Sequence, residues 1–205
     1  MTWEVRPSPN HGDPRQLTLG VVIHSTRGGA ASQQAEYAAT INWFANPISE
    51  VSAHRVIGFE GAGAVIVDDD LIAWHATDHN NRWLGVELTE PFITDPYSEE
   101  QYRSLADLLL EWSAKYGFPL DRDHLVAHSE VNPQKSDPGP LFDWDRLMAL
   151  LLGGDMQSII ESLNREWALL DAIQQHPEAT QAIKDLAEQV KQEGVVEVKK
   201  AIGLQ

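Results

Sequence analysis

The feature that most constrains the fold is a series of short apolar, β-branched runs that alternate with longer helical segments. Residues 17–26, LTLGVVIHST, have the pattern of a buried strand, and residues 84–89 and 124–128 have the same character. The stretch 54–75 adds a strand, a glycine-rich turn and two further strands. Because such strands bury their faces against helices, the sequence predicts an α/β domain with a central sheet flanked by helices.

The helices of this domain carry their own start and stop signals. Residues 30–45 are predicted to form one helix, which Asn46-Pro47 ends. A second helix begins at Ser98, which forms a capping box with Gln101, and ends at Gly117. A third starts from about Asp143.

The pair Gly153-Gly154 is the clearest break in the chain. It predicts a first domain of residues 1–152 and an all-helical C-terminal segment of residues 153–205. In that segment we expect one helix from Asp155 to the break at His176-Pro177, and a second that Gly194 ends. The segment could drive homo-oligomerisation or brace the first domain, because its first helix has an apolar stripe that must pack on something: Ile159, Leu163, Trp167 and Leu170.

Composition excludes several kinds of protein. The absence of cysteine removes disulfides, thiolate nucleophiles and cysteine-rich zinc sites, so a metal site must use histidines and carboxylates. A net charge of −16 argues against nucleic acid and anionic membrane surfaces as partners. No apolar run approaches the ~20 residues of a membrane span. The N-terminus, MTWEVRPSPNHGDP, does not resemble a signal peptide, so we expect synthesis in the cytoplasm without one.

Three separated side chains could form a metal site. His24 and His128 each stand at the polar end of an apolar strand, and Asp137 follows nine residues later in a loop stiffened by prolines. Two imidazoles and a carboxylate are a ligand set that leaves zinc a fourth position open for water. A lone strand-end histidine is more often a hydrogen-bonded structural residue, so the inference depends on the three meeting in space.

Five sequence motifs that occur in a fixed order together resemble those of a known protein family. They are VVIHST, SAHRVIG, AWHA, LGVEL and AHSEVNPQKSDPGPLFDW, and together they cover roughly residues 17–151. The chain resembles the zinc-dependent N-acetylmuramoyl-L-alanine amidases, a family that includes phage amidase endolysins and peptidoglycan recognition proteins. This resemblance implies the family's α/β fold with a central mixed β-sheet.

The resemblance also assigns the chemistry to residues. It implies one Zn²⁺ per chain, held by His24, His128 and Asp137, the last being a carboxylate where some relatives have cysteine. Glu87 is the expected catalytic acid and base, and Lys135 is expected to stabilise the oxyanion. The alternatives are a surface glutamate on an edge strand and a solvated loop lysine.

Other residues each have two interpretations, which have similar weight for His54 and His75. His54 and His75 could line the substrate cleft or orient a ligand from behind, or each could be a structural histidine between strands. Trp74 and Asn81, with Asn80, could contact a glycan or peptide, although surface packing is the commoner role of such residues.

The resemblance implies hydrolysis of the amide between N-acetylmuramic acid and L-alanine in peptidoglycan, so the partner is peptidoglycan or a muropeptide. The C-terminal helical segment favours a phage or prophage endolysin, which would reach the cell wall after membrane permeabilisation and could contact the wall through these helices. The alternatives are a cytoplasmic muropeptide-recycling amidase and a non-catalytic peptidoglycan-binding module.

Overall fold

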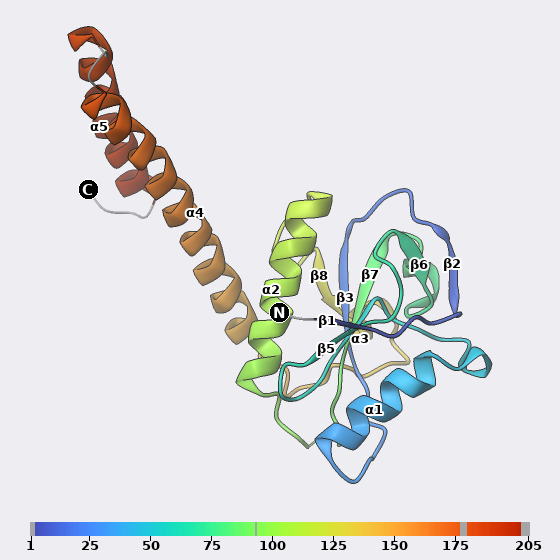
Figure 1. Ribbon diagram of the computed structural model, residues 1–205. Coiled ribbons are helices and arrows are strands. Elements are labelled where there is room, and N and C mark those ends of the chain that lie inside the picture. The colour runs from blue at the N-terminus through green and yellow to red at the C-terminus, as the bar shows by residue number, and fades with distance from the viewer. Residues whose placement is uncertain (1–2, 93, 177–179, 202–205) are drawn as a thin grey trace. The chain divides into compact units, whose positions relative to one another are not determined.

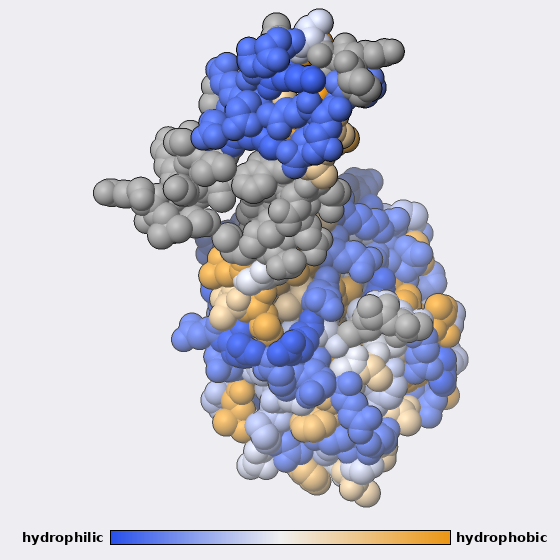
Figure 2. Space-filling model, turned by 60° about the vertical axis from the view of Figure 1, so that its left-hand side comes forward, coloured by the Kyte–Doolittle hydropathy of each residue, from blue (hydrophilic) through white to orange (hydrophobic). Residues whose placement is uncertain are grey.

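The computed structural model describes the backbone of residues 3–92, 94–176 and 180–201, without the side chains of residues 154–167, 182 and 193–201. The chain divides into two compact units, Met1–Gly154 and Asp155–Gln205. On the face that Figure 2 shows, hydrophilic residues dominate and hydrophobic residues form separate patches. Within the described residues, no helix combines the length and the apolar content that crossing a membrane requires.

A six-stranded mixed sheet forms the centre of the first unit, in the order β1-β5-β4-β7-β3-β8 (Figure 1). Strand β3 runs parallel to both of its neighbours, β7 and β8, whereas β4 is parallel to β7 and antiparallel to β5. The α/β fold with a central mixed sheet is therefore confirmed. The strands of this sheet are β1 (Trp3–Val5), β3 (Gly20–Ser25), β4 (Arg55–Ile57), β5 (Gly63–Val65), β7 (Trp83–Leu88) and β8 (Leu125–Ala127).

A second, smaller sheet lies beside the first. Its two antiparallel strands are β2 (His11–Pro14) and β6 (Leu71–Ala73). The stretch from 54 to 75 thus contains the three predicted strands, but the third of them pairs away from the main sheet.

Each face of the main sheet is covered by a different helix, as Figure 1 shows. Helix α2 (Glu99–Tyr116) packs with Val21 and Ile23 of β3 and with the apolar residues of β7. Helix α1 (Gln33–Phe44) packs on the other face, over Val56 of β4. Because side chains alternate along a strand, His24 points to the α1 face while its neighbour Ile23 lies in the α2 core.

The signals predicted for the first-unit helices are found in the structure, with α1 ending at Phe44 just before Asn46-Pro47. Its start lies three residues later than predicted, where Ser32 caps the helix by accepting from the main-chain N–H of Ala35. Ser98 and Gln101 form the reciprocal capping box of α2, and Gly117 ends that helix in the left-handed conformation. The remaining helical elements before residue 140 are η1 (Pro47–Ser49), η2 (Thr77–His79) and α3 (His128–Val131).

Two expected helix boundaries are wrong. Helix α4 (Trp144–Gln175) continues through Gly153-Gly154, and α5 (Gln181–Ala201) continues through Gly194. A glycine inside a helix costs only about 1 kcal/mol relative to alanine, so helix-forming neighbours can carry the helix across it. The first turns of α4 belong to the core of the first unit, where Leu147 and Leu151 are buried.

Within the second unit, the two helices are paired by polar contacts. The amide of Gln174 on α4 donates to Glu188 on α5 at 2.7 Å, and Lys191 of α5 bonds to Asp171 and Gln174. Of the predicted apolar stripe, only Leu170 has a described side chain, and it is half-buried. The other three stripe residues, Ile159, Leu163 and Trp167, lie outside the described side chains.

Candidate functional site

Strand register brings His24 and Glu87 together. In the parallel pair of β3 and β7, His24 is opposite Glu87, so both side chains leave the same face of the sheet at the same strand ends. His128 directly follows β8, which is the other parallel neighbour of β3. The carboxyl ends of three adjacent strands therefore deliver both predicted histidine ligands and the predicted acid to one edge of the sheet.

Asp137 completes a cluster of three donor atoms. The Nδ1 atoms of His24 and His128 lie 2.9 Å apart, and the Oδ2 atom of Asp137 lies 3.3 Å from the first and 3.0 Å from the second. Tetrahedral zinc with bonds of about 2.0–2.1 Å holds its ligand atoms roughly 3.3 Å apart. Two imidazole nitrogens that face each other beside a carboxylate present lone pairs to one point, so these residues fit a zinc ion.

His75 lies directly behind His24 and fixes its orientation. The Nε2 atom of His24 is 3.0 Å from Nδ1 of His75, and Nε2 of His75 is 3.1 Å from the main-chain oxygen of Trp83. Because that oxygen can only accept, His75 carries its proton on Nε2 and accepts at Nδ1 from His24. The Nδ1 lone pair of His24 is then left free to bind a metal.

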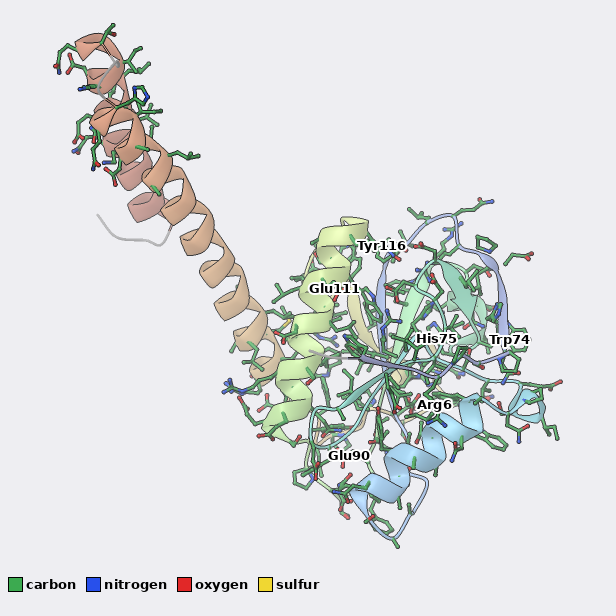
Figure 3. All side chains as sticks on the ribbon, in the orientation of Figure 1. Arg6, Trp74, His75, Glu90, Glu111 and Tyr116 are labelled. Carbon is green, nitrogen blue, oxygen red and sulfur yellow. The ribbon has the colours of Figure 1, made fainter. Side chains whose placement is uncertain are left out.

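The loop around His75 is held by Asn80 rather than Asn81. The Oδ1 atom of Asn80 accepts from the main-chain N–H of His75 at 2.9 Å and from that of Ala76. Figure 3 places His75 among the strands of the first unit and Trp74 at their outer edge. Asn81 is exposed and is not among the residues that line the cavities described below.

His54 is fully buried, away from the three donor atoms. Its Nδ1 accepts from the main-chain N–H of Gly85 at 2.9 Å, and its Nε2 donates to the oxygen of Leu71 at 3.1 Å. Burial, and next the positive charge of Arg15, lowers the pKa of His54 to about 3, so the ring is neutral at physiological pH. These contacts favour the structural interpretation, in which His54 packs behind His75 and joins β7 to β6.

The electrostatics of the cluster suit a cation. Burial lowers the pKa of His24 and of His75, which keeps both rings neutral. Although burial opposes its charged form, the two neighbouring imidazoles hold the pKa of Asp137 well below its usual range. Neutral imidazole beside an ionised carboxylate is the protonation state that zinc binding requires.

Glu87 and Lys135 both face the metal cluster. Burial, and next the negative charge of Asp137, raises the pKa of Glu87 well above its ordinary value, and the charge of Lys135 opposes this rise. A carboxyl group with a raised pKa can hold a proton near neutral pH and give it up during a reaction. Lys135 is exposed on the loop two residues before Asp137.

Two cavities meet at Glu87. The first, of about 250 Å³, is lined by the three donor residues, Glu87, Lys135, His75 and Trp74 among others. The second, of about 350 Å³, lies along α1, where Arg27 and Trp43 help to line it. Because both cavities share Thr26, Phe44 and Glu87, a bound molecule could extend from the metal cluster along α1.

Comparison with known proteins identifies the family. A family model described as N-acetylmuramoyl-L-alanine amidase matches residues 14–140. The chain belongs to this family. The amidase is 30% identical over 168 residues to 1,6-anhydro-N-acetylmuramyl-L-alanine amidase AmpD of Enterobacter cloacae. The matched region covers 71% of this chain and 88% of that protein. It is 34% identical over 168 residues to AmpD of Escherichia coli K12, with 71% and 90% covered.

Solved structures agree with this assignment. A crystal structure of a selenomethionine derivative of AmpD matches the amidase with a TM-score of 0.58 and 27% identity, covering 73% of this chain and 94% of that one. The catalytic domain of XlyA has the same fold, with a TM-score of 0.59 at 20% identity, over 74% and 99% of the two chains. The chain is thus an N-acetylmuramoyl-L-alanine amidase, and the alternative of a non-catalytic binding module is not supported.

Residues that hold the loops around the site were not predicted. The buried carboxylate of Glu36 accepts from the main-chain N–H groups of Gly28 at 2.7 Å and Ala30 at 3.1 Å. The sequence predicts for Asn80 only a substrate-contact or surface-packing role, although an asparagine in a turn often accepts from the backbone of its own loop. No sequence pattern marks Glu36, because its partners are set by the return of the chain from β3 to α1.

Proposed function

We propose that the amidase binds one Zn²⁺ per chain through His24, His128 and Asp137, and with it hydrolyses the amide between N-acetylmuramic acid and L-alanine. The observation that carries the proposal is the convergence of three donor atoms, 2.9–3.3 Å apart, at one edge of the sheet. When bound there, the ion would polarise the scissile carbonyl and lower the pKa of a water molecule.

Residues of the chain would transfer protons, stabilise the developing negative charge and orient the metal ligands. In its ionised form Glu87 takes the proton from the attacking water and then passes it to the leaving amine of L-alanine. Its raised pKa makes this carboxylate a stronger base, and it lines the metal cavity. Lys135 supplies a positive charge for the oxyanion that develops on the carbonyl. His75 holds His24 in the orientation that points Nδ1 at the ion.

For the substrate we propose a soluble 1,6-anhydro-muropeptide. The support is that several relatives at 30% identity or more are named 1,6-anhydro-N-acetylmuramyl-L-alanine amidases. The two joined cavities offer space on both sides of Glu87 for a short peptide and one sugar.

An endolysin that acts on intact wall is the second candidate. The observation that favours it is the second unit, whose helices lie beyond the family match at residues 14–140. Such a unit could contact the wall or another copy of the chain.

The test compares the two substrates at equal concentrations of scissile amide. Zinc-loaded protein is mixed with purified 1,6-anhydro-muropeptide or with intact sacculi, and new free amines on alanine are counted over time. We expect a markedly faster release from the soluble muropeptide. Faster release from sacculi would support the endolysin instead, and new reducing sugar ends without new alanine amines would contradict amidase activity.

A further inference from the structure

The loop that carries Asp137 has little packing of its own. Its residues Pro133, Gln134, Lys135 and Ser136 are all exposed, and only at Pro138 does the chain become buried again. A functional side chain must nevertheless be held to within about 0.5 Å of its working position. Hydrogen bonds between this loop and the rest of the first unit are therefore what fixes the carboxylate.

Tyr97 holds the chain just after Asp137. Its hydroxyl donates to the main-chain oxygen of Pro138 at 2.7 Å. The ring of Tyr97 is set by an aromatic cluster, with Phe142 edge-on at a centroid distance of 5.2 Å and Tyr102 of α2 at 6.1 Å. The hydroxyl of this packed ring thus bonds to the residue that follows the carboxylate.

Arg27 holds the chain just before Asp137. Its Nη1 donates to the hydroxyl of Ser136 at 2.9 Å and its Nη2 to the main-chain oxygen of the same residue at 3.3 Å. The backbone of Arg27 has a φ of 88°, a strained conformation for a residue other than glycine. Such a conformation persists only where its surroundings impose it, and the bond from the Arg27 N–H to the oxygen of Glu90 at 2.7 Å is one such constraint.

Asp137 itself is tied to the other ligands through the backbone. Its main-chain oxygen accepts from the N–H of Ser129 at 3.1 Å, next to His128. The carboxylate is therefore bracketed, with one anchor on the residue before it, one on its own peptide group and one on the residue after it. Two of these three anchors are side chains that are not themselves metal donors.

We propose that Arg27 and Tyr97 are positioning residues for Asp137, which raise zinc affinity by holding Ser136 and Pro138. The inference rests on the proposed function, because zinc is the ion concerned. Removing either anchor leaves all three donor atoms in the chain but lets the carboxylate move. Loss of such a supporting contact typically weakens metal binding about 10–100-fold.

The test measures zinc affinity of the full-length chain by competition with a chromophoric chelator. Tyr97→Phe removes only the hydroxyl, and Arg27→Gly removes the guanidinium while relieving the backbone strain. We expect each variant to bind zinc about 10–100-fold more weakly, while the metal-free Arg27→Gly protein unfolds at no lower denaturant concentration than wild type. Arg27→Lys keeps the charge and one donor, so it should recover part of the lost affinity.

Tyr102→Phe is the matched control. The Tyr102 hydroxyl belongs to the same aromatic cluster but accepts from the N–H of Asp143, six residues beyond the carboxylate. This variant should keep the zinc affinity of wild type. Wild-type affinity in both Tyr97→Phe and Arg27→Gly, or an equal loss in Tyr102→Phe, would overturn the positioning role. A wild-type protein that binds no zinc would instead defeat the proposed function itself.

Discussion

Glu87 differs from an ordinary surface glutamate in two respects that the structure makes visible. It stands opposite His24 across one strand pair, and burial together with the charge of Asp137 raises its pKa. Neither property depends on Glu87 donating to the metal cluster. Proton transfer and metal binding should therefore be separable by substitution.

The first prediction concerns that separation. Glu87→Gln keeps the size of the side chain but cannot exchange a proton, so turnover should fall about 100-fold or more. Zinc content should remain that of wild type, because the three donor atoms are unchanged. Amide hydrolysis is measured by amine release and zinc by elemental analysis. Near-normal turnover would show that another group acts as the base.

A second carboxyl group, Glu90, gives a prediction about pH. Its side chain is 2% exposed, and burial raises its pKa from 4.5 to about 7. The folded protein therefore keeps a proton that the unfolded chain releases above pH 4.5. Folded stability falls as the pH rises from 4.5 through 7, and the loss, on the order of 3 kcal/mol, persists at higher pH.

Glu90→Gln removes this loss. The free energy of unfolding of the variant should exceed that of wild type at pH 8 by up to ~3 kcal/mol, with a much smaller difference at pH 4.5. Denaturant unfolding at both pH values measures it. Glu111→Gln, at an exposed position on α2, should show no such pH-dependent gain. Equal stability of wild type and Glu90→Gln at pH 8 would contradict the inference that folding raises the pKa of Glu90.

At the residue scale, the sequence picked out three side chains that the structure brings together, but not the residues that support them. His24 and His128 drew attention because each ends an apolar strand, and the family resemblance added Asp137 in its proline-stiffened loop. Asn80 and Asn81 have the same expected role of contacting a glycan or peptide, yet the Asn80 side chain instead accepts from the backbone of the His75 loop. Such differences depend on which side chain faces inward in a turn, and periodicity carries no information about that.

Among the elements, β7 has a packing requirement that the sequence alone does not explain. A Cβ atom on Gly85 would lie 2.6–2.8 Å from three ring atoms of His75, so the strand must have glycine for the ring to lie against it. The ring in that position is what accepts from His24. The glycine of LGVEL thus contributes indirectly to the proposed metal site.

Gly85→Ala should therefore displace His75. We expect a loss of stability of about 1–3 kcal/mol from overpacking, together with weaker zinc binding. Gly12→Ala on β2 is the control, because its Cβ would meet Ile72 at an ordinary 3.4 Å. Denaturant unfolding and chelator competition measure the two effects. Unchanged zinc affinity in Gly85→Ala would separate His75 from the metal site.

The strands that were not predicted are the exposed ones. Strand β1 has half-buried and exposed residues, and β2 is mostly exposed, so neither shows the apolar alternation that marks a strand. Strand β1 forms because it pairs with β5, and β2 forms because it pairs with β6. A short stretch of sequence does not show which distant strand it will pair with. The capping box and Gly117 of α2, by contrast, are signals that a short stretch of sequence contains in full.

Helix α4 offers a direct test of the corrected boundary. Gly153 is exposed, and a Cβ there would meet no atom within 4 Å. If the helix is continuous, Gly153→Ala should raise the free energy of unfolding by about 0.5–1 kcal/mol through helix propensity alone. Circular dichroism during denaturation of the full chain measures the change. A destabilised variant would indicate that the glycine pair interrupts the helix after all.

For the whole molecule, the fold could be predicted because five motifs keep their order over roughly residues 17–151. The function of the second unit could not be predicted, because its helical pattern fits self-association, wall binding and bracing of the first unit equally well. The net charge of −16 describes the entire chain and says little about the site, where Lys135 and Arg27 place positive charge beside the two cavities.

The measurement that tests the account most directly is the zinc content of the purified full-length amidase beside that of His24→Ala. Elemental analysis after dialysis against metal-free buffer should find one zinc per chain in the wild type and almost none in the variant, together with loss of amide hydrolysis. A wild type that retains no zinc, or a variant that retains the full complement, would contradict the assignment of these three side chains.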